Sequence, residues 1–440
     1  MMSSSRRFGV VGAVAAIIGL GVMSLPASAT PTTRRVSVTS SGAQAGAIGE
    51  HSGDPSLSAT GRFIAFESQK TDLVANDTNL YEDVFLHDKS TGKVTRISVR
   101  SNEGQALNGS SNDASISATG RWIAFESEAD NLVTGDTNGQ NDVFVRDRVA
   151  GTTRRVSVKS NGAQVTDNDS TNPAISADGR FVTFESQSET LVPNDTNTVQ
   201  DIFVHDRSTG KTRRVNLRSN GAQALLEDSE DPAISATGRF VVFETDAANL
   251  VTGDSNGFVD VFVHDRSTGQ TRRVSVKSNG AQATGGHSDT ASISGSGRFV
   301  AFESGATNLD SNGFIDVFVF DRDTTTLKRM SVHTNGTASN GDSLNPRIST
   351  NGRMVVFVSA ATNLSASDDD TVLDVYVRDR NTAKTRLLSL SSTGVKGDGE
   401  SSDARVSGDG RFAAWGSAAT NLVTDDTNDA NDVFLRGPLY

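Results

Sequence analysis

The sequence predicts an all-β protein, a seven-bladed β-propeller of four-stranded antiparallel blades, and three observations lead to this fold class. The pair Gly-Arg recurs seven times at a nearly constant spacing along the chain. Each pair follows a tight turn and opens a strand-like run that is rich in phenylalanine. No helical periodicity interrupts the repeats, and a long fixed period built from short strands is typical of propeller blades. The glycines of these pairs are Gly61, Gly120, Gly179, Gly238, Gly297, Gly352 and Gly410.

The second repeat shows the four strands that we expect in each unit, whose period is 120 − 61 = 59 for the first two copies. Residues 113–117 alternate in character, and residues 121–126 form an apolar run after a Gly-containing turn. A third strand is expected at 142–146 and a fourth at 153–158, joined by a hairpin turn. The connection after the second strand and the one to the next repeat are long and polar, whereas the other two are short.

Most of the aromatic residues fall in three columns of the repeat. These columns hold 20 of the 26 aromatic residues. Two of the columns lie three residues apart on the second strand, so they point to opposite faces of it. A blade that is packed between two neighbours needs two apolar faces, so we expect these residues to form the core. The columns are Phe63, Trp122, Phe181, Phe240, Phe299, Met354 and Phe412; Phe66, Phe125, Phe184, Phe243, Phe302, Phe357 and Trp415; and Phe85, Phe144, Phe203, Phe262, Phe318, Tyr376 and Phe434.

The two ends of the repeat array predict how the ring closes. The seventh repeat stops after its third strand, and residues 32–38 are identical to residues 152–158, a fourth strand. We therefore expect the N-terminal strand, at about 32–38, to complete the C-terminal blade. A closed ring has no terminal repeat whose apolar face must be covered. The paired arginines of the outermost strands are expected to prevent these strands from pairing with strands of other molecules.

Residues 1–29 are predicted to be an export signal. Arg6 and Arg7 precede an apolar run at residues 8–25, and residues 27–29 form a cleavage site of small residues. The run is also long enough for the alternative, an uncleaved membrane anchor. We expect a single propeller domain at residues 30–440, located outside the cell or in the periplasm or cell envelope.

Charge and composition exclude several classes of partner. Loss of two arginines with the signal leaves 41 − 2 = 39 basic against 53 acidic residues, a formal charge of −14. This balance argues against nucleic acid, which needs a basic face. The absence of cysteine excludes disulfides, thiolate metal sites and a cysteine nucleophile. We expect a monomer that does not insert into the membrane once the signal is cleaved.

The core of the third repeat, Ser176-Ala-Asp-Gly-Arg-Phe-Val-Thr-Phe184, resembles the repeat of TolB-like, WD-like (PD40-type) propellers, whose usual core is Ser-Pro-Asp-Gly followed by a hydrophobic strand. The resemblance spans about residues 32–436. It implies an exported propeller that binds proteins, or a propeller attached to a peptidase domain. The repeats here depart from the pattern, because the proline is absent and each unit is longer than usual.

The long connections carry an acidic motif, Asp-x-Asn-x-x-x-Asp, with aspartate in place of asparagine in the sixth repeat. Calcium takes six to eight oxygen ligands, and alternating Asp and Asn side chains supply several, so these residues are candidate metal ligands. The alternative is a structural Asx turn, in which the same side chains cap backbone amides. The motif residues are Asp77, Asn79 and Asp83; Asp136, Asn138 and Asp142; Asp195, Asn197 and Asp201; Asp254, Asn256 and Asp260; Asp310, Asn312 and Asp316; Asp368, Asp370 and Asp374; and Asp426, Asn428 and Asp432.

The fifth residue of this motif varies between repeats and is aromatic at Tyr81, Phe258 and Phe314. Apolar side chains at a loop tip are candidate contacts for a partner. The alternative is that they pack against the neighbouring loop.

The sequence predicts binding and assigns no catalytic residue. It contains no Gly-x-Ser-x-Gly elbow and no His-Glu-x-x-His helix. We expect an exported, non-enzymatic binding or scaffold propeller that engages a protein or glycan through the long acidic loops of one face, with calcium as the only candidate cofactor. The alternative is a polysaccharide-active enzyme, a hydrolase or lyase, with its site at the mouth of the central channel. A purely structural envelope protein is a third option.

Overall fold

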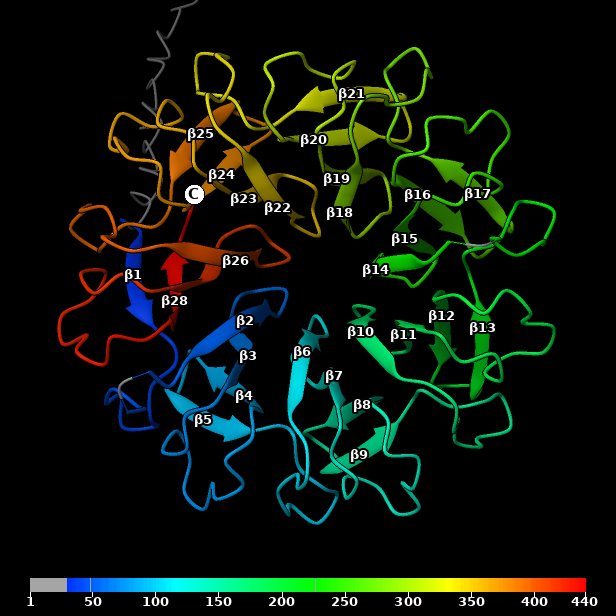
Figure 1. Cartoon of the computed structure of the whole chain (residues 1–440). Coiled ribbons are helices and arrows are strands. Elements are labelled where there is room, and N and C mark those ends of the chain that lie inside the picture. The colour runs from blue at the N-terminus through cyan, green and yellow to red at the C-terminus, as the bar shows by residue number, and fades with distance from the viewer. Residues whose placement is uncertain (1–29, 48, 226) are drawn as a thin grey trace, which may run out of the picture.

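Seven four-stranded antiparallel sheets form the blades of a ring (Figure 1), which confirms the predicted propeller. The structure is a computed structural model that describes residues 30–47, 49–225 and 227–440. The signal predicted at residues 1–29 lies outside these residues. Within the described ranges, no helix is long and apolar enough to cross a membrane.

The two inner strands of each blade follow the predicted pattern. The innermost strands surround the central axis and are β2 (Ser52–Leu57), β6 (Ser111–Ile116), β10 (Ser170–Ile175), β14 (Ser229–Ile234), β18 (Ser288–Ile293), β22 (Ser343–Ile348) and β26 (Ser401–Val406). The second strands are β3 (Phe63–Ser68), β7 (Trp122–Ser127), β11 (Phe181–Ser186), β15 (Phe240–Thr245), β19 (Phe299–Ser304), β23 (Met354–Ser359) and β27 (Ala413–Ser417).

The two outer strands complete each blade. The third strands are β4 (Asp83–Asp88), β8 (Asp142–Asp147), β12 (Asp201–Asp206), β16 (Asp260–Asp265), β20 (Asp316–Asp321), β24 (Asp374–Asp379) and β28 (Asp432–Gly437). The outermost strands lie at the rim and are β5 (Lys93–Arg96), β9 (Thr152–Arg155), β13 (Lys211–Arg214), β17 (Gln270–Arg273), β21 (Thr326–Arg329), β25 (Lys384–Leu387) and β1 (Thr32–Arg35).

The N-terminal strand closes the ring as predicted. β1 pairs antiparallel with β28, from Thr32 opposite Gly437 to Arg35 opposite Phe434. Beyond the strand, Val36 N donates to Val433 O at 2.7 Å, so the pairing continues for one more residue. The seventh blade therefore joins the two ends of the chain, and we call this junction the seam.

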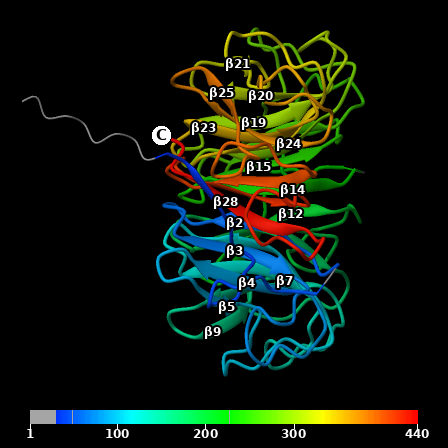
Figure 2. The same ribbon diagram turned by 90° about the vertical axis from the view of Figure 1, so that its left-hand side faces the viewer.

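Antiparallel order places the connections of each blade alternately on two faces of the ring. The short turns between first and second and between third and fourth strands lie on one face, which we call the short-turn face. The long connections lie on the other, which we call the long-loop face. Both ends of the described chain emerge on the short-turn face (Figure 2).

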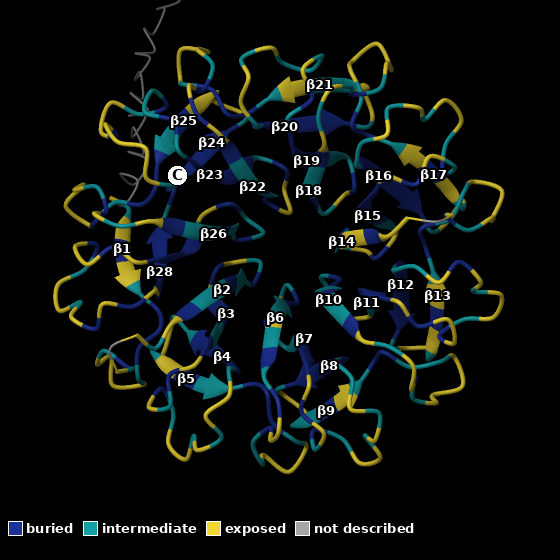
Figure 3. Cartoon of the chain, in the orientation of Figure 1, coloured by how far each residue is buried: buried dark blue, intermediate teal, exposed yellow. Residues whose placement is uncertain are grey.

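The core lies between the blades, because both faces of each sheet are apolar. One cluster joins Phe63 and Val84 of the first blade to Ile123 and Phe125 of the second. Within each blade, second and third strands stack an aromatic pair, as in Phe125 against Phe144 with ring centroids 5.9 Å apart. The second and third strands of each blade are mostly buried, the innermost strands are partly buried, and the loop tips and parts of the outermost strands are exposed (Figure 3). The aromatic columns are thus core, as predicted.

Packing between blades explains the recurring Gly-Arg pair. Gly120 has a φ of +70°, and an added Cβ would lie 2.3 Å from the ring of Phe63 in the preceding blade. Only glycine fits this left-handed turn against an aromatic ring. Arg121 then makes two hydrogen bonds to Asp147, at 2.9 and 2.8 Å, and lies over Trp122 at 4.5 Å. The pair therefore links a turn, a neighbouring blade and the third strand.

Candidate functional site

In the first blade, the acidic motif of the long loop surrounds an arginine of the outermost strand. Nη1 of Arg96 lies 2.8 Å from Asp77 Oδ1 and 3.0 Å from Asp83 Oδ2. Asn79 Nδ2 donates to Asp83 Oδ2 at 2.9 Å, and Ser98 donates to the other oxygen of Asp83. The motif therefore ties the long loop to β4 and β5.

The same ion-pair network recurs wherever the outermost strand ends in arginine. Its members are Arg155 with Asp136 and Asp142, Arg214 with Asp195 and Asp201, Arg273 with Asp254 and Asp260, Arg329 with Asp310 and Asp316, and Arg35 with Asp426 and Asp432. Burial raises the pKa of Asp77, and likewise of Asp195, to about 6 even though an arginine lies beside each. In these six blades the guanidinium supplies the positive charge that a calcium ion would bring. Calcium binding by their motifs stays a prediction.

The sixth blade lacks this arginine and gathers three carboxylates. Leu387 stands at the arginine position, and Lys396 Nζ lies 2.9 Å from Asp370 Oδ2 and 3.0 Å from Asp374 Oδ2. Tyr376, where the other blades carry phenylalanine, donates its hydroxyl to Asp368. One oxygen from each of the three aspartates lies within 4.8 Å of the others, the one such carboxylate triad among the described residues.

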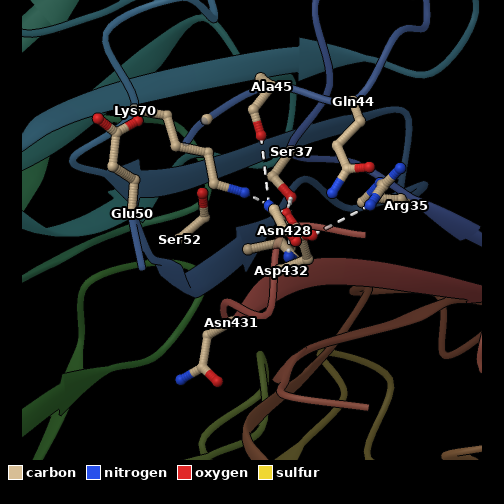
Figure 4. Close-up of polar contacts among 12 residues, drawn as sticks. Arg35, Ser37, Gln44, Ala45, Glu50, Ser52, Lys70, Asn428, Asn431 and Asp432 are labelled. Atoms are coloured by element: carbon tan, nitrogen blue, oxygen red, sulfur yellow. Dashed lines mark hydrogen bonds and ion pairs between the residues drawn. The ribbon is translucent and has the colours of Figure 1, made fainter. Parts of the chain in front are cut away.

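At the seam, a second cation joins the network (Figure 4). Lys70, which follows β3 of the first blade, is fully buried, and its Nζ pairs with Asp432 of β28. The same carboxylate accepts hydrogen bonds from Arg35 at 3.2 Å and from Ser37 at 2.5 Å. A Cβ at Gly46 would lie 2.7 Å from the Lys70 chain. The lysine therefore connects three segments of chain that meet only where the ring closes.

Lys70 differs from the residues at the equivalent position of the other six repeats. The other repeats carry a small residue there, namely Ala129, Ser188, Ala247, Ala306, Ala361 and Ala419. The column comparison was the signal that could have identified this lysine from sequence.

The three aromatic loop-tip residues differ in exposure. Tyr81 is 42% and Phe314 39% exposed, whereas Phe258 packs edge-on against His287 with ring centroids 5.2 Å apart. Leu80, beside Tyr81, is 82% exposed and has a φ of +62°. A bulky side chain at positive φ is uncommon and is held there by its surroundings. The loop tip of the first blade therefore presents apolar side chains to solvent.

The central channel is lined by a bulge in each innermost strand. The residue at the bulge has positive φ in all seven blades and lies within the innermost strand. These residues are Asp54, Asp113, Asn172, Asp231, Thr290, Asn345 and Asp403. Asp and Asn tolerate this conformation better than other non-glycine residues, which accounts for the column.

Five glutamates join neighbouring blades beside this bulge. Glu126 Oε2 accepts the amide of Asn172 at 2.8 Å, and Glu67, Glu185, Glu244 and Glu303 make the same contact to the next blade. Burial and neighbouring carboxylates raise the pKa of Glu67 to about 10 and that of Glu244 to about 9. Burial raises the pKa of the other three to about 7. The channel wall therefore holds bound protons near neutral pH.

Two arginines break the symmetry of the channel. Arg347 of β22 and Arg405 of β26 stand where the first five blades carry Ser56, Ser115, Ala174, Ala233 and Ser292. Both arginines line a cavity of about 190 Å³ that also touches the bulge residues of blades one to five. Arg405 Nη2 lies 3.8 Å from Asp54 Oδ1. Sequence analysis missed this site, although the departures are visible in the repeat column.

The short-turn end of the channel is narrowed by a ring of backbone hydrogen bonds. Ala59 N donates to Ala118 O at 2.9 Å, and equivalent bonds follow from turn to turn until Asp409 N donates to Ala59 O at 2.7 Å. Thr350 projects between Gly295 and Gly408, where an added Cβ would meet it at 2.3 and 2.9 Å. The turns of the blades therefore fill part of the short-turn end of the channel.

Comparison with known proteins supports the fold. No family model and no curated protein matches the sequence. An oligogalacturonate lyase in complex with manganese is 11% identical with a TM-score of 0.52, and the match covers 93% of this chain and 90% of that one. The acylaminoacyl peptidase of Pyrococcus horikoshii is 11% identical with a TM-score of 0.53, and the match covers 89% of this chain and 52% of that one. At such identities the likeness shows a shared propeller fold alone.

TolB from Acinetobacter baumannii is also similar, at 15% identity and a TM-score of 0.43 over 74% of this chain. This chain spans 63% of that TolB chain and about half of the peptidase, 52%. The TolB likeness is too low to carry an argument about function.

Proposed function

We propose that this chain is an exported, non-enzymatic binding propeller that engages a protein or glycan partner through its long-loop face. The proposal rests on the observation that ion pairs hold the long loops in place. In six blades the motif aspartates pair with a cation of the same blade, and in the seventh they pair with Arg35 of the closing strand β1. Loops held on a rigid scaffold are where proteins usually place binding residues.

Exposed apolar side chains on the same face support the proposal. Leu80, Tyr81 and Leu107 are 82%, 42% and 41% exposed. The Asn79 amide donates to Ala106 O at 3.0 Å, which holds the two loops that carry these residues side by side. Solvent-exposed apolar side chains that are gathered on one surface mark sites of interaction.

A capture experiment tests the choice of face. Leu80→Ser with Tyr81→Ser alters the long-loop face, and Val149→Ser alters an exposed apolar residue, 67% exposed, in the β8–β9 turn on the opposite face. We expect cross-linked capture from the native cell envelope to retain a specific partner with Val149→Ser and to lose it with the double variant. Equal capture by all three proteins, or loss with Val149→Ser alone, would contradict the assignment.

A polysaccharide-active enzyme is the second candidate, favoured by the two arginines that break the channel symmetry. Against it, the residues that line the cavity include no histidine and no aromatic residue for sugar stacking. Incubation with a panel of acidic and neutral polysaccharides separates the two functions. Turnover that is lost on Asp231→Asn would establish the enzyme and remove the non-enzymatic proposal.

We also propose that calcium binds in the sixth blade, where the triad of Asp368, Asp370 and Asp374 offers clustered carboxylate oxygens. Lys396 must then move away from the carboxylates. Calorimetric titration of chelator-treated protein provides the test, with Asp370→Asn, the residue of the other repeats, as the matched variant. Heat and a rise in melting temperature that Asp370→Asn abolishes are expected, whereas no response to millimolar calcium would end the metal hypothesis.

A further inference from the structure

Of the two channel arginines, only Arg405 has an ion pair among the described residues, the 3.8 Å contact with Asp54. Arg347 donates to the backbone oxygen of Pro346 at 3.2 Å, and among the described residues no carboxylate oxygen lies within ion-pair distance of it. Burial and the adjacent Arg405 lower the pKa of Arg347 to about 10. Two half-buried guanidinium groups on neighbouring blades repel each other, so an anion placed between them would be stabilised.

The opposite wall of the same cavity has the reverse character. Asp113 and Asp231 face the cavity with Asn172 between them, and Thr290 follows on the next blade. These side chains present carboxylate, amide and hydroxyl oxygens, which accept hydrogen bonds from an ammonium group. The cavity therefore has its cations on blades six and seven and acceptor groups on blades one to five, and only Asp54 of blade one is paired with an arginine.

The size and access of the cavity limit what it can hold. Its volume of about 190 Å³ is below the range of roughly 300–1,000 Å³ typical of sites for drug-sized ligands. The ring of turn-to-turn hydrogen bonds narrows the short-turn end, which favours entry of a ligand from the long-loop face. A small metabolite fits these limits, and a polymer chain does not.

We propose that this cavity binds a small zwitterion of the free amino-acid class, with its carboxylate at Arg347 and Arg405 and its ammonium group at the Asp113–Asn172–Asp231 wall. A multiply charged anion such as phosphate would be repelled by the aspartates, and a simple cation by the arginines. A zwitterion satisfies both walls at once. This site is separate from the partner-binding face proposed above, and neither depends on the other.

Thermal-shift and calorimetric titrations of the purified protein with the common free amino acids test the proposal. Lactate, which lacks the ammonium group, and ethanolamine, which lacks the carboxylate, serve as probes with one charge each. We expect at least one amino acid to raise the melting temperature at millimolar concentration, and neither singly charged probe to do so. No response to any amino acid, or an equal response to lactate, would overturn the proposal.

Variants taken from the protein's own repeats identify the site. Arg347→Ser and Arg405→Ser insert the residue of the first blade, and Asp231→Asn inserts that of the third. Each is expected to weaken binding about tenfold or more, since each removes a charged hydrogen-bonding partner. Arg154→Ser, an exposed arginine at the rim, is the charge-matched control and should bind as the parent does. Unchanged affinity in all three cavity variants, or loss in the control, would overturn the assignment.

Discussion

The sixth and seventh blades neutralise the same pair of motif aspartates in different ways. In the seventh blade, Arg35 pairs with Asp426 and Asp432, and Lys70 of the first blade adds a second cation. In the sixth, Leu387 stands at the position of this arginine, and Lys396 from the connection to the next blade pairs with the motif aspartates instead. The position of the positive charge is thus constrained by the aspartates, whereas the residue that supplies it is free to change.

Departures from the repeat are therefore coupled sets of substitutions and not independent ones. In the sixth blade, Leu387, Lys396 and Asp370 replace the arginine, glutamine and asparagine of the second blade, which are Arg155, Gln164 and Asn138. At the seam, Lys70 accompanies Gly46, because a side chain at residue 46 would collide with the lysine.

The largest effect is expected when the second blade loses its cation. Arg155→Leu, the residue of the sixth blade, leaves Asp136 and Asp142 without a positive partner, and we expect the free energy of unfolding to fall by about 3–5 kcal/mol. Adding Gln164→Lys supplies the lysine of the sixth blade and should recover about half of the loss. Urea denaturation measures both variants, and a single variant as stable as the parent would refute the role of the network.

The seam should be less sensitive, since Asp432 has two cations. Lys70→Ala removes a fully buried lysine but leaves Arg35 and Ser37 on the carboxylate. We expect a loss of about 2–3 kcal/mol, below the usual cost of breaking a buried pair. Lys93→Ala, at an exposed lysine of β5, is the control and should change stability by less than about 0.5 kcal/mol. Similar effects in the two variants would show that Lys70 does not hold the seam.

The sixth and seventh blades also differ from the others in the wall of the channel. Blades one to five carry a glutamate on the second strand, whereas the sixth has Val358 and the seventh Gly416 at this position. The raised pKa of Glu244, about 9, means that the folded chain keeps a proton at pH 7 that the unfolded chain releases near its ordinary value of 4.5. Stability is therefore lost as pH rises through this window. Burial lowers the pKa of His205 and that of His264 to about 4. These two side chains therefore make the folded state more stable as pH rises from about 4 to 6.5, and they do not affect the pH dependence above 6.5.

Glu244→Gln should flatten this pH dependence between about pH 7 and 8.5, by up to about 1.4 kcal/mol per pH unit. Glutamine keeps a neutral acceptor for the Thr290 amide, so the fold is retained. Glu189→Gln, at an exposed glutamate, is the matched control. Denaturation curves at several pH values provide the measurement, and parallel slopes for parent and Glu244→Gln would contradict a proton held at this site.

The repeat allowed the ring, its blade number, the seam and the aromatic core to be predicted, because each is a property of columns that recur once in every repeat. The partners of the motif aspartates could not be predicted, since Asp77 and Arg96 meet only when the outermost strand folds back along β4. Lys70 and Arg347 were missed for another reason. Lys70 occurs once in its column and Arg347 shares its column position only with Arg405, so the role of each depends on which side chains the closed ring brings around it.

The smallest effect tests whether Lys70 and Gly46 form a coupled pair. Gly46→Ala places a side chain at a φ of +88° and against the lysine, so we expect a loss of about 1–2 kcal/mol. In the Lys70→Ala background the collision disappears and only the cost of the backbone conformation remains, so the loss should shrink to about 1 kcal/mol. The double-mutant cycle measures this difference by urea denaturation. Additive losses would mean that Gly46 is required only for the backbone conformation of its turn, and that Gly46 and Lys70 contribute to stability independently.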